Sequence, residues 1–145
     1  MEEFAMRSRS ALLPALVIGL ALAASGLFAS AAAAEDASLP RLVKIHADWC
    51  GTCVALEPTW ATLVADFADR IEPHVFDVTD RPRLRASRER AEALGLADFL
   101  AVNQGRTGTV ALIAPDGRVI EKFKGELRVD RYEAALASWE QGRDG

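Results

Sequence analysis

The chain has 145 residues, which is enough for one domain with one hydrophobic core and leaves no room for a second. Half of the residues are apolar and 26% are charged, so the composition is that of a globular protein. The net charge of −4 argues against a nucleic-acid-binding protein, because such proteins present a basic surface.

The N-terminal segment, residues 1–34, has the parts of a secretory signal: Arg7 and Arg9, then the uncharged stretch 11–34, which ends in small residues. Cleavage there would leave a domain of residues 35–145. The alternative is an uncleaved membrane anchor, because 11–34 is long enough to cross a hydrocarbon core of about 30 Å. Both alternatives predict an exported or periplasmic domain, since the positive charges remain in the cytoplasm.

Hydrophobic periodicity in the remaining chain predicts four strands and three main helices. The strands are expected at 42–47, 71–79, 109–114 and 118–124, and the helices at 54–67, 82–94 and 129–141, with a short helical turn at 96–102. Gly95 is expected to stop the second helix, and Pro115-Asp116-Gly117 is expected to form the turn between the last two strands. The order βαβαββα predicts an α/β fold in which helices cover both faces of a four-stranded mixed sheet.

Both cysteines lie in the segment Trp49-Cys50-Gly51-Thr52-Cys53, directly after the first predicted strand. A C-x-x-C spacing at the start of a helix lets two thiols form and open a disulfide without moving the backbone. Half of a zinc site has the same spacing, but a four-cysteine site would need a second pair, which the sequence lacks. A bridge across so short a loop constrains the unfolded chain little, so reactivity explains the pair better than stability.

The segment Ala47–Cys53, together with Pro58, resembles the active site of thioredoxin-fold proteins, and the resemblance extends over about residues 42–139. It implies a thioredoxin-like three-layer fold and a thiol–disulfide oxidoreductase that needs no organic cofactor. Cys50 would then attack the disulfide of a protein substrate, and Cys53 would resolve the mixed disulfide. Because the chain has only two cysteines, its electrons are expected to come from a separate redox partner, such as a membrane reductase.

The resemblance also implies which residues contact the substrate, namely Trp49, Gly51, Thr52, Gly108 and Thr109. Gly51 matches the thioredoxin dipeptide, whereas Thr52 replaces its proline. In oxidants of the family a histidine precedes the second cysteine. Thr52 precedes Cys53 in this chain, so we expect a reductant. Thr109 lies where thioredoxins have a cis-proline, so substrate docking along the backbone of this loop is expected to differ.

Two further positions depart from the thioredoxin pattern. In thioredoxins a buried acid helps to deprotonate the second cysteine, and Lys44 stands at its position here. We expect this lysine to reach solvent from a sheet edge. Glu57 and Asp48 are then the candidate bases for Cys53. His46 could join Cys50 and Cys53 in a three-ligand zinc or copper site, and the alternative function is therefore a metal carrier. A packed core histidine is the commoner case, and we predict no metal ligands.

Two other groups of residues favour structural interpretations. Trp60 and Trp139 are expected in the core because they follow helical spacing. The arginines of the second helix are expected on its solvated face; they are Arg81, Arg83, Arg85, Arg88 and Arg90.

Overall fold

A computed structural model describes residues 38–143 of the chain. The expected signal or anchor at 1–34 lies outside the described residues. The strands are β1 (Arg41–His46), β2 (Glu72–Asp77), β3 (Thr109–Ile113) and β4 (Val119–Lys124), and the helices are α1 (Gly51–Asp66), α2 (Arg81–Ala93), α3 (Ala97–Asn103) and α4 (Val129–Arg143). The predicted βαβαββα order is confirmed, and the expected helical turn is the short helix α3. Within residues 38–143, no helix is both long enough and apolar enough to cross a membrane.

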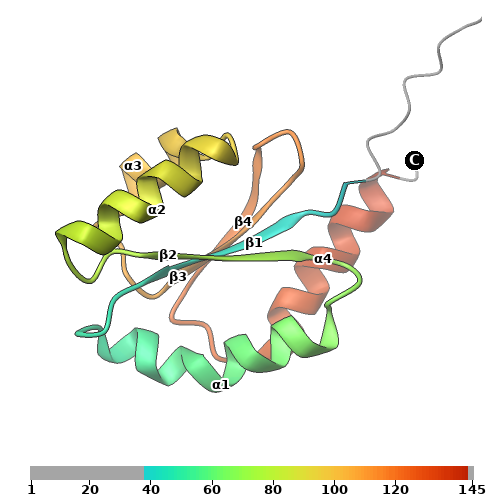
Figure 1. Cartoon of the computed structure of the whole chain (residues 1–145). Helices are drawn as coiled ribbons and strands as arrows, with labels where there is room; N and C mark the ends of the chain where they lie inside the picture. The colour runs from blue at the N-terminus through green and yellow to red at the C-terminus, as the bar shows by residue number, and fades with distance from the viewer. Residues whose placement is uncertain (1–37, 144–145) are drawn as a thin grey trace, which may run out of the picture. The chain divides into compact units, whose positions relative to one another are not determined.

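The four strands form one mixed sheet in the order β2-β1-β3-β4. β1 pairs in parallel with β2 across the α1 crossover, and it pairs antiparallel with β3, which in turn pairs antiparallel with β4. Figure 1 shows α1 and α4 on one face of the sheet and α2 and α3 on the other. The predicted α/β fold with three layers is therefore confirmed, and β1 is a central strand.

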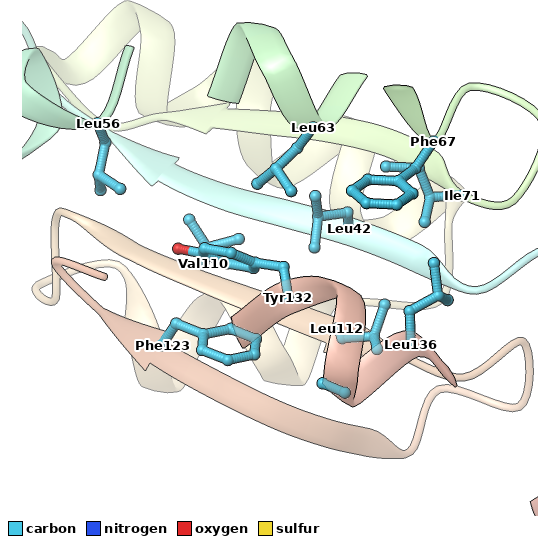
Figure 2. Close-up of a cluster of buried hydrophobic side chains, with 11 residues drawn as sticks. Leu42, Leu56, Leu63, Phe67, Ile71, Val110, Leu112, Phe123, Tyr132 and Leu136 are labelled. Carbon is cyan, nitrogen blue, oxygen red and sulfur yellow. The ribbon is translucent and has the colours of Figure 1, made fainter. Parts of the chain in front are cut away.

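Each face of the sheet has its own apolar core, because side chains along a strand alternate between the two faces. The core beneath α1 and α4 is shown in Figure 2 and consists of Leu42, Leu56, Leu63, Phe67, Ile71, Val110, Leu112, Phe123, Tyr132, Ala135 and Leu136. The core beneath α2 and α3 consists of Val43, Ile45, Phe76, Ala91, Leu96, Leu100, Ala111 and Ile113. Trp60 and Trp139 pack against the first core, which confirms their predicted structural role.

One end of the sheet collects the segments around the two cysteines. β1 ends four residues before Cys50, and its last pairing to β3 joins Ile45 to Thr109. Thr109 in turn pairs with Lys124, the last residue of β4. The start of α1, the start of β3 and the end of β4 therefore meet at this end.

Candidate active site

Cys50 and Cys53 are joined as a disulfide at the N-terminus of α1, with their Cα atoms 5.2 Å apart. Cys50 is the N-cap residue, and its Sγ accepts a hydrogen bond from the Cys53 backbone N–H at 3.2 Å. Unpaired N–H groups and the partial positive charge of a helix N-terminus favour a thiolate at this position. The sequence-based placement of Cys50 at the start of the helix is confirmed.

The two sulfur-bearing residues differ in exposure. Cys50 is 8% exposed, whereas Cys53 is completely buried beside Ala47 and Val78. The Cys53 Sγ lies 3.7 Å from the Ile45 carbonyl oxygen in the interior. An incoming sulfur can therefore approach Cys50, while Cys53 is restricted to reaction with its neighbour.

The Thr52 side chain fits against two glycines from distant segments. A Cβ atom on Gly108 would lie 2.8 Å from the Thr52 Cγ2 and 3.7 Å from the Cys50 Sγ. A Cβ atom on Gly125 would lie 3.0 Å from the same methyl carbon. Both glycines have a positive φ, which disfavours other residues. This contact between Thr52, Gly108 and Gly125 is not predictable from the sequence, because nothing in the linear pattern shows which loops meet.

The residues expected to contact substrate fall into two groups. Gly51 and Thr52 are exposed, and Trp49 is 66% exposed. Gly108 and Thr109 are buried. The Gly108 N–H donates to the Ile45 carbonyl at 2.9 Å, and the Gly108 carbonyl accepts from the Gly125 N–H at 3.0 Å. Because both polar backbone groups of Gly108 are engaged internally, neither is free to pair with a substrate strand in this conformation.

The loop before Cys50 is fastened to the junction between β2 and α2. The Trp49 indole N–H donates to the Thr79 carbonyl at 3.0 Å, and the Asp48 backbone N–H donates to the Thr79 hydroxyl at 2.9 Å. That hydroxyl donates to Asp77 Oδ1 at 2.5 Å. The Trp49 ring is therefore held in place while most of its surface stays open to solvent.

Arg83 adds an ionic link to the same loop. Its Nη1 donates to Asp48 Oδ2 at 2.5 Å, and His46 Nε2 lies 3.2 Å from Asp48 Oδ1. The hydrogen bond from Arg83, followed by that from His46, holds the pKa of Asp48 below its usual value. Asp48 is therefore a poor base. Arg83 is exposed as predicted, but the sequence did not reveal its contact with the loop.

The expectation that Lys44 reaches solvent from a sheet edge is wrong. β1 is central, so Lys44 is only 3% exposed beneath α1. Its Nζ donates to Glu57 Oε1 at 2.8 Å and lies 4.8 Å from the centre of the Trp60 ring. Glu57 lies one turn after Cys53 on α1, but its carboxylate is engaged as the partner of this buried ammonium.

The alternative metal site is not brought together by the fold. His46 directs Nε2 to Asp48, and its Nδ1 lies 3.5 Å from Glu57 Oε1. Among residues 38–143, the group whose ligand atoms lie within 4.8 Å of one another is His46, Asp48 and Asp77, without either cysteine. The geometry therefore gives no support to a metal carrier that uses Cys50, Cys53 and His46.

A disulfide at a helix N-terminus, with one buried cysteine and one at the surface, defines a thiol–disulfide exchange site on an α/β sheet. The family model for thioredoxin matches residues 25–101, which is more than half of the chain and includes both cysteines. The chain belongs to the thioredoxin family. The expected thiol–disulfide oxidoreductase activity on protein substrates is supported by this membership and by the cysteine pair.

Several solved structures resemble the fold. Thioredoxin from Fasciola hepatica is 17% identical, with 69% of this chain and 80% of that chain covered and a TM-score of 0.48. Thioredoxin O2 from Arabidopsis thaliana in the oxidized state is 19% identical, with coverage of 70% and 75% and a TM-score of 0.47. Trxlp from Edwardsiella tarda is 22% identical, with coverage of 69% and 84% and a TM-score of 0.45.

A search of curated proteins found no match to the chain.

Proposed function

We propose that the protein is an exported thiol–disulfide oxidoreductase that reduces disulfides in protein substrates, with Cys50 as the nucleophile and Cys53 as the resolving thiol. The observation that carries this proposal is the asymmetry of the pair. Cys50 caps α1 and has some exposed surface, whereas Cys53 has none. A reaction that must begin at one sulfur and end at the other requires this arrangement.

In the reducing direction the cycle has two exchange steps. The Cys50 thiolate attacks one sulfur of the substrate disulfide, which forms a mixed disulfide and releases the first substrate thiolate. The Cys53 thiolate then attacks the Cys50 Sγ, which forms the Cys50–Cys53 disulfide and releases the second substrate thiolate. Two electrons have passed to the substrate, and a separate dithiol protein must return two electrons to the cysteine pair.

The reducing direction is supported by Gly51 and by the absence of a histidine before Cys53, which are features of the thioredoxin dipeptide rather than of family oxidants. Export is supported by the charge and hydropathy pattern of residues 1–34. In an exported protein the dithiol donor would have to receive cytoplasmic electrons across the membrane, and we propose a membrane reductase for that role.

Three variants test the assignment of the cysteines. Cys53→Ser is expected to accumulate a mixed disulfide with a reducible protein such as insulin, because the resolving thiol is missing. Cys50→Ser should form no such adduct and should not reduce insulin, and the double variant is the matched control. Adduct formation by Cys50→Ser at the level of Cys53→Ser would overturn the roles assigned here. Equilibration with glutathione buffers gives the potential, which is expected nearer to about −270 mV than to about −120 mV for a reductant.

Export is tested separately from the chemistry. The full chain fused to a reporter enzyme that is active only outside the cytoplasm should give activity, and deletion of residues 1–34 should abolish it. Mass spectrometry of the recovered protein distinguishes a cleaved signal, with a new N-terminus near Glu35, from a retained anchor.

A further inference from the structure

The end of the sheet that holds the disulfide also holds a cavity of about 270 Å³. Its lining residues come from the end of α3, the loop after α3, the start of β3 and the edge strand β4; they are Asn103, Arg106, Thr109, Lys122, Phe123 and Lys124. Thr109 directly follows Gly108, where a Cβ atom would lie 3.7 Å from the Cys50 Sγ. The cavity is therefore close enough to the disulfide for one bound polypeptide to reach both.

The charge of this cavity is opposite to that of the chain. Three of its six lining residues are cationic and none is acidic, although the chain carries a net charge of −4. Arg106 and Lys122 are exposed, and neither takes part in an ion pair within the described part of the chain. Lys124 donates from Nζ to the Thr107 carbonyl, which places a third positive charge at the start of β3. These three cationic side chains favour an anionic ligand in the cavity.

The lining also contains a buried polar group that lacks a partner. Asn103 is only 4% exposed, and its Nδ2 donates to the Phe99 carbonyl at 2.7 Å. This hydrogen bond fixes which end of the amide is the oxygen, and that Oδ1 has no hydrogen-bond partner. A buried acceptor without a donor is costly, and because this oxygen is itself buried, a ligand N–H reaches it when the Asn103 side chain turns towards the cavity that it lines.

We propose that this cavity binds an acidic segment of the protein substrate, with Arg106 and Lys122 holding a carboxylate and Asn103 accepting from an N–H of the same segment. A polypeptide offers a carboxylate and an amide donor within a few ångströms of each other, whereas a simple inorganic anion offers chiefly acceptors. The site would select substrates in which an acidic residue lies near the disulfide. This inference rests on the proposed function, because the segment assigned to the cavity belongs to a substrate that reacts at Cys50.

The test uses the reduced full-length protein and two series of disulfide-bonded peptides. In one series a single Glu is moved through the four positions on either side of the reactive cysteine, and in the other Gln replaces it. At one position the Glu peptide is expected to have a kcat/KM about tenfold above that of its Gln partner, which corresponds to about 1.4 kcal/mol. The preference should appear mainly in KM and should decline as salt is added.

The double variant Arg106→Gln/Lys122→Gln should reduce the Glu-to-Gln ratio to about one. The matched control is Arg118→Gln, because Arg118 is also exposed but lies before the other end of β4, paired with Asp116. Asn103→Ala should weaken binding of both series, since it removes the acceptor and leaves the cations. Circular dichroism confirms that each variant is folded.

The outcomes separate this inference from the function on which it rests. If wild-type protein reduces neither series, the proposed function fails. If it reduces both equally at every position, or if the double variant keeps the preference, the function stands and the acidic-segment site is refuted.

Discussion

Lys44 shows how a single charged residue can be accommodated in a core. Its ammonium is withdrawn from water beneath α1 and is compensated by one carboxylate, that of Glu57, which is itself 49% exposed. Removing the carboxylate would leave the ammonium buried and unpaired, whereas removing the ammonium would leave a carboxylate that water still reaches. The two residues should therefore be strongly coupled in stability.

We predict that Glu57→Gln lowers the free energy of unfolding by about 1–3 kcal/mol, less than for a fully buried pair because water reaches Glu57. Lys44→Met should cost little, and in that background Glu57→Gln should cost less than about 0.5 kcal/mol. Urea denaturation of the four proteins measures the coupling. An equal cost of Glu57→Gln in both backgrounds would show that the ion pair has no role in stability.

A second residue-scale prediction concerns Gly108, which has a φ of +76° and whose Cβ position lies 2.8 Å from the Thr52 methyl carbon. Gly108→Ala should destabilise the protein by about 2 kcal/mol or more, because a left-handed conformation costs about 1–2 kcal/mol and the methyl groups collide. Gly105→Ala is the control, since nothing lies within 4 Å of its Cβ position. Denaturant midpoints compare them, and similar midpoints would disprove the close contact.

At the scale of elements, local patterns predicted most of the structure. The alternation in β1, the apolar spacing in α1 and the turn residues 115–117 all lead to the elements observed. Local patterns do not predict the order of the strands in the sheet, because strand pairing depends on contacts between distant segments. The placement of Lys44 at an edge failed for this reason: the strand was predicted correctly, but its central position was not.

In the candidate site, too, local features were predicted and contacts between distant segments were not. Cys50 and Cys53 were found because their spacing and the preceding strand are local features. Contacts of the loop before Cys50 with Thr79 and Arg83 were missed, since those residues lie 31 and 35 positions from Asp48 in the chain. Polar residues in a loop and on an exposed helix face carry no signal of such a partner.

The packing of β2 against α2 predicts that the free energy of unfolding depends on pH through His74. Burial lowers the pKa of this histidine, and although Glu72 acts in the opposite direction, the net shift is downward. Arg90 Nη2, which can only donate, lies 3.0 Å from His74 Nδ1 and favours the neutral ring. The unfolded chain therefore binds a proton more readily than the folded protein.

The contribution of neutral His74 to the free energy of unfolding should be complete above the unfolded pKa of about 6.5. It should be lost as the pH falls from there towards the lower pKa of the folded state. Between pH 7.5 and 5.5, wild-type protein should lose more stability than His74→Gln, which has no imidazole at this position. Urea titrations at both pH values measure the two losses. Equal losses would mean that His74 titrates alike in the folded and unfolded states.

At the scale of the whole molecule, one sheet separates two cores and also joins them. Leu42 and Val43 are neighbours in β1, yet the first belongs to the core beneath α1 and α4 and the second to the core beneath α2 and α3. Damage to one core must therefore disturb the strands that support the other. We expect the described domain to unfold in a single cooperative transition, as small domains usually do.

Leu100→Ala tests this expectation, because Leu100 is fully buried in the core beneath α2 and α3. The cavity should cost about 2–5 kcal/mol. In a Trp49→Phe background, fluorescence reports Trp60 and Trp139, which pack on the opposite face. The fluorescence and far-ultraviolet circular dichroism midpoints should fall together, whereas Val102→Ala, at a 69% exposed position of the same helix, should shift neither. A fluorescence midpoint that stays unchanged in Leu100→Ala while the dichroism midpoint falls would mean that the two faces unfold independently.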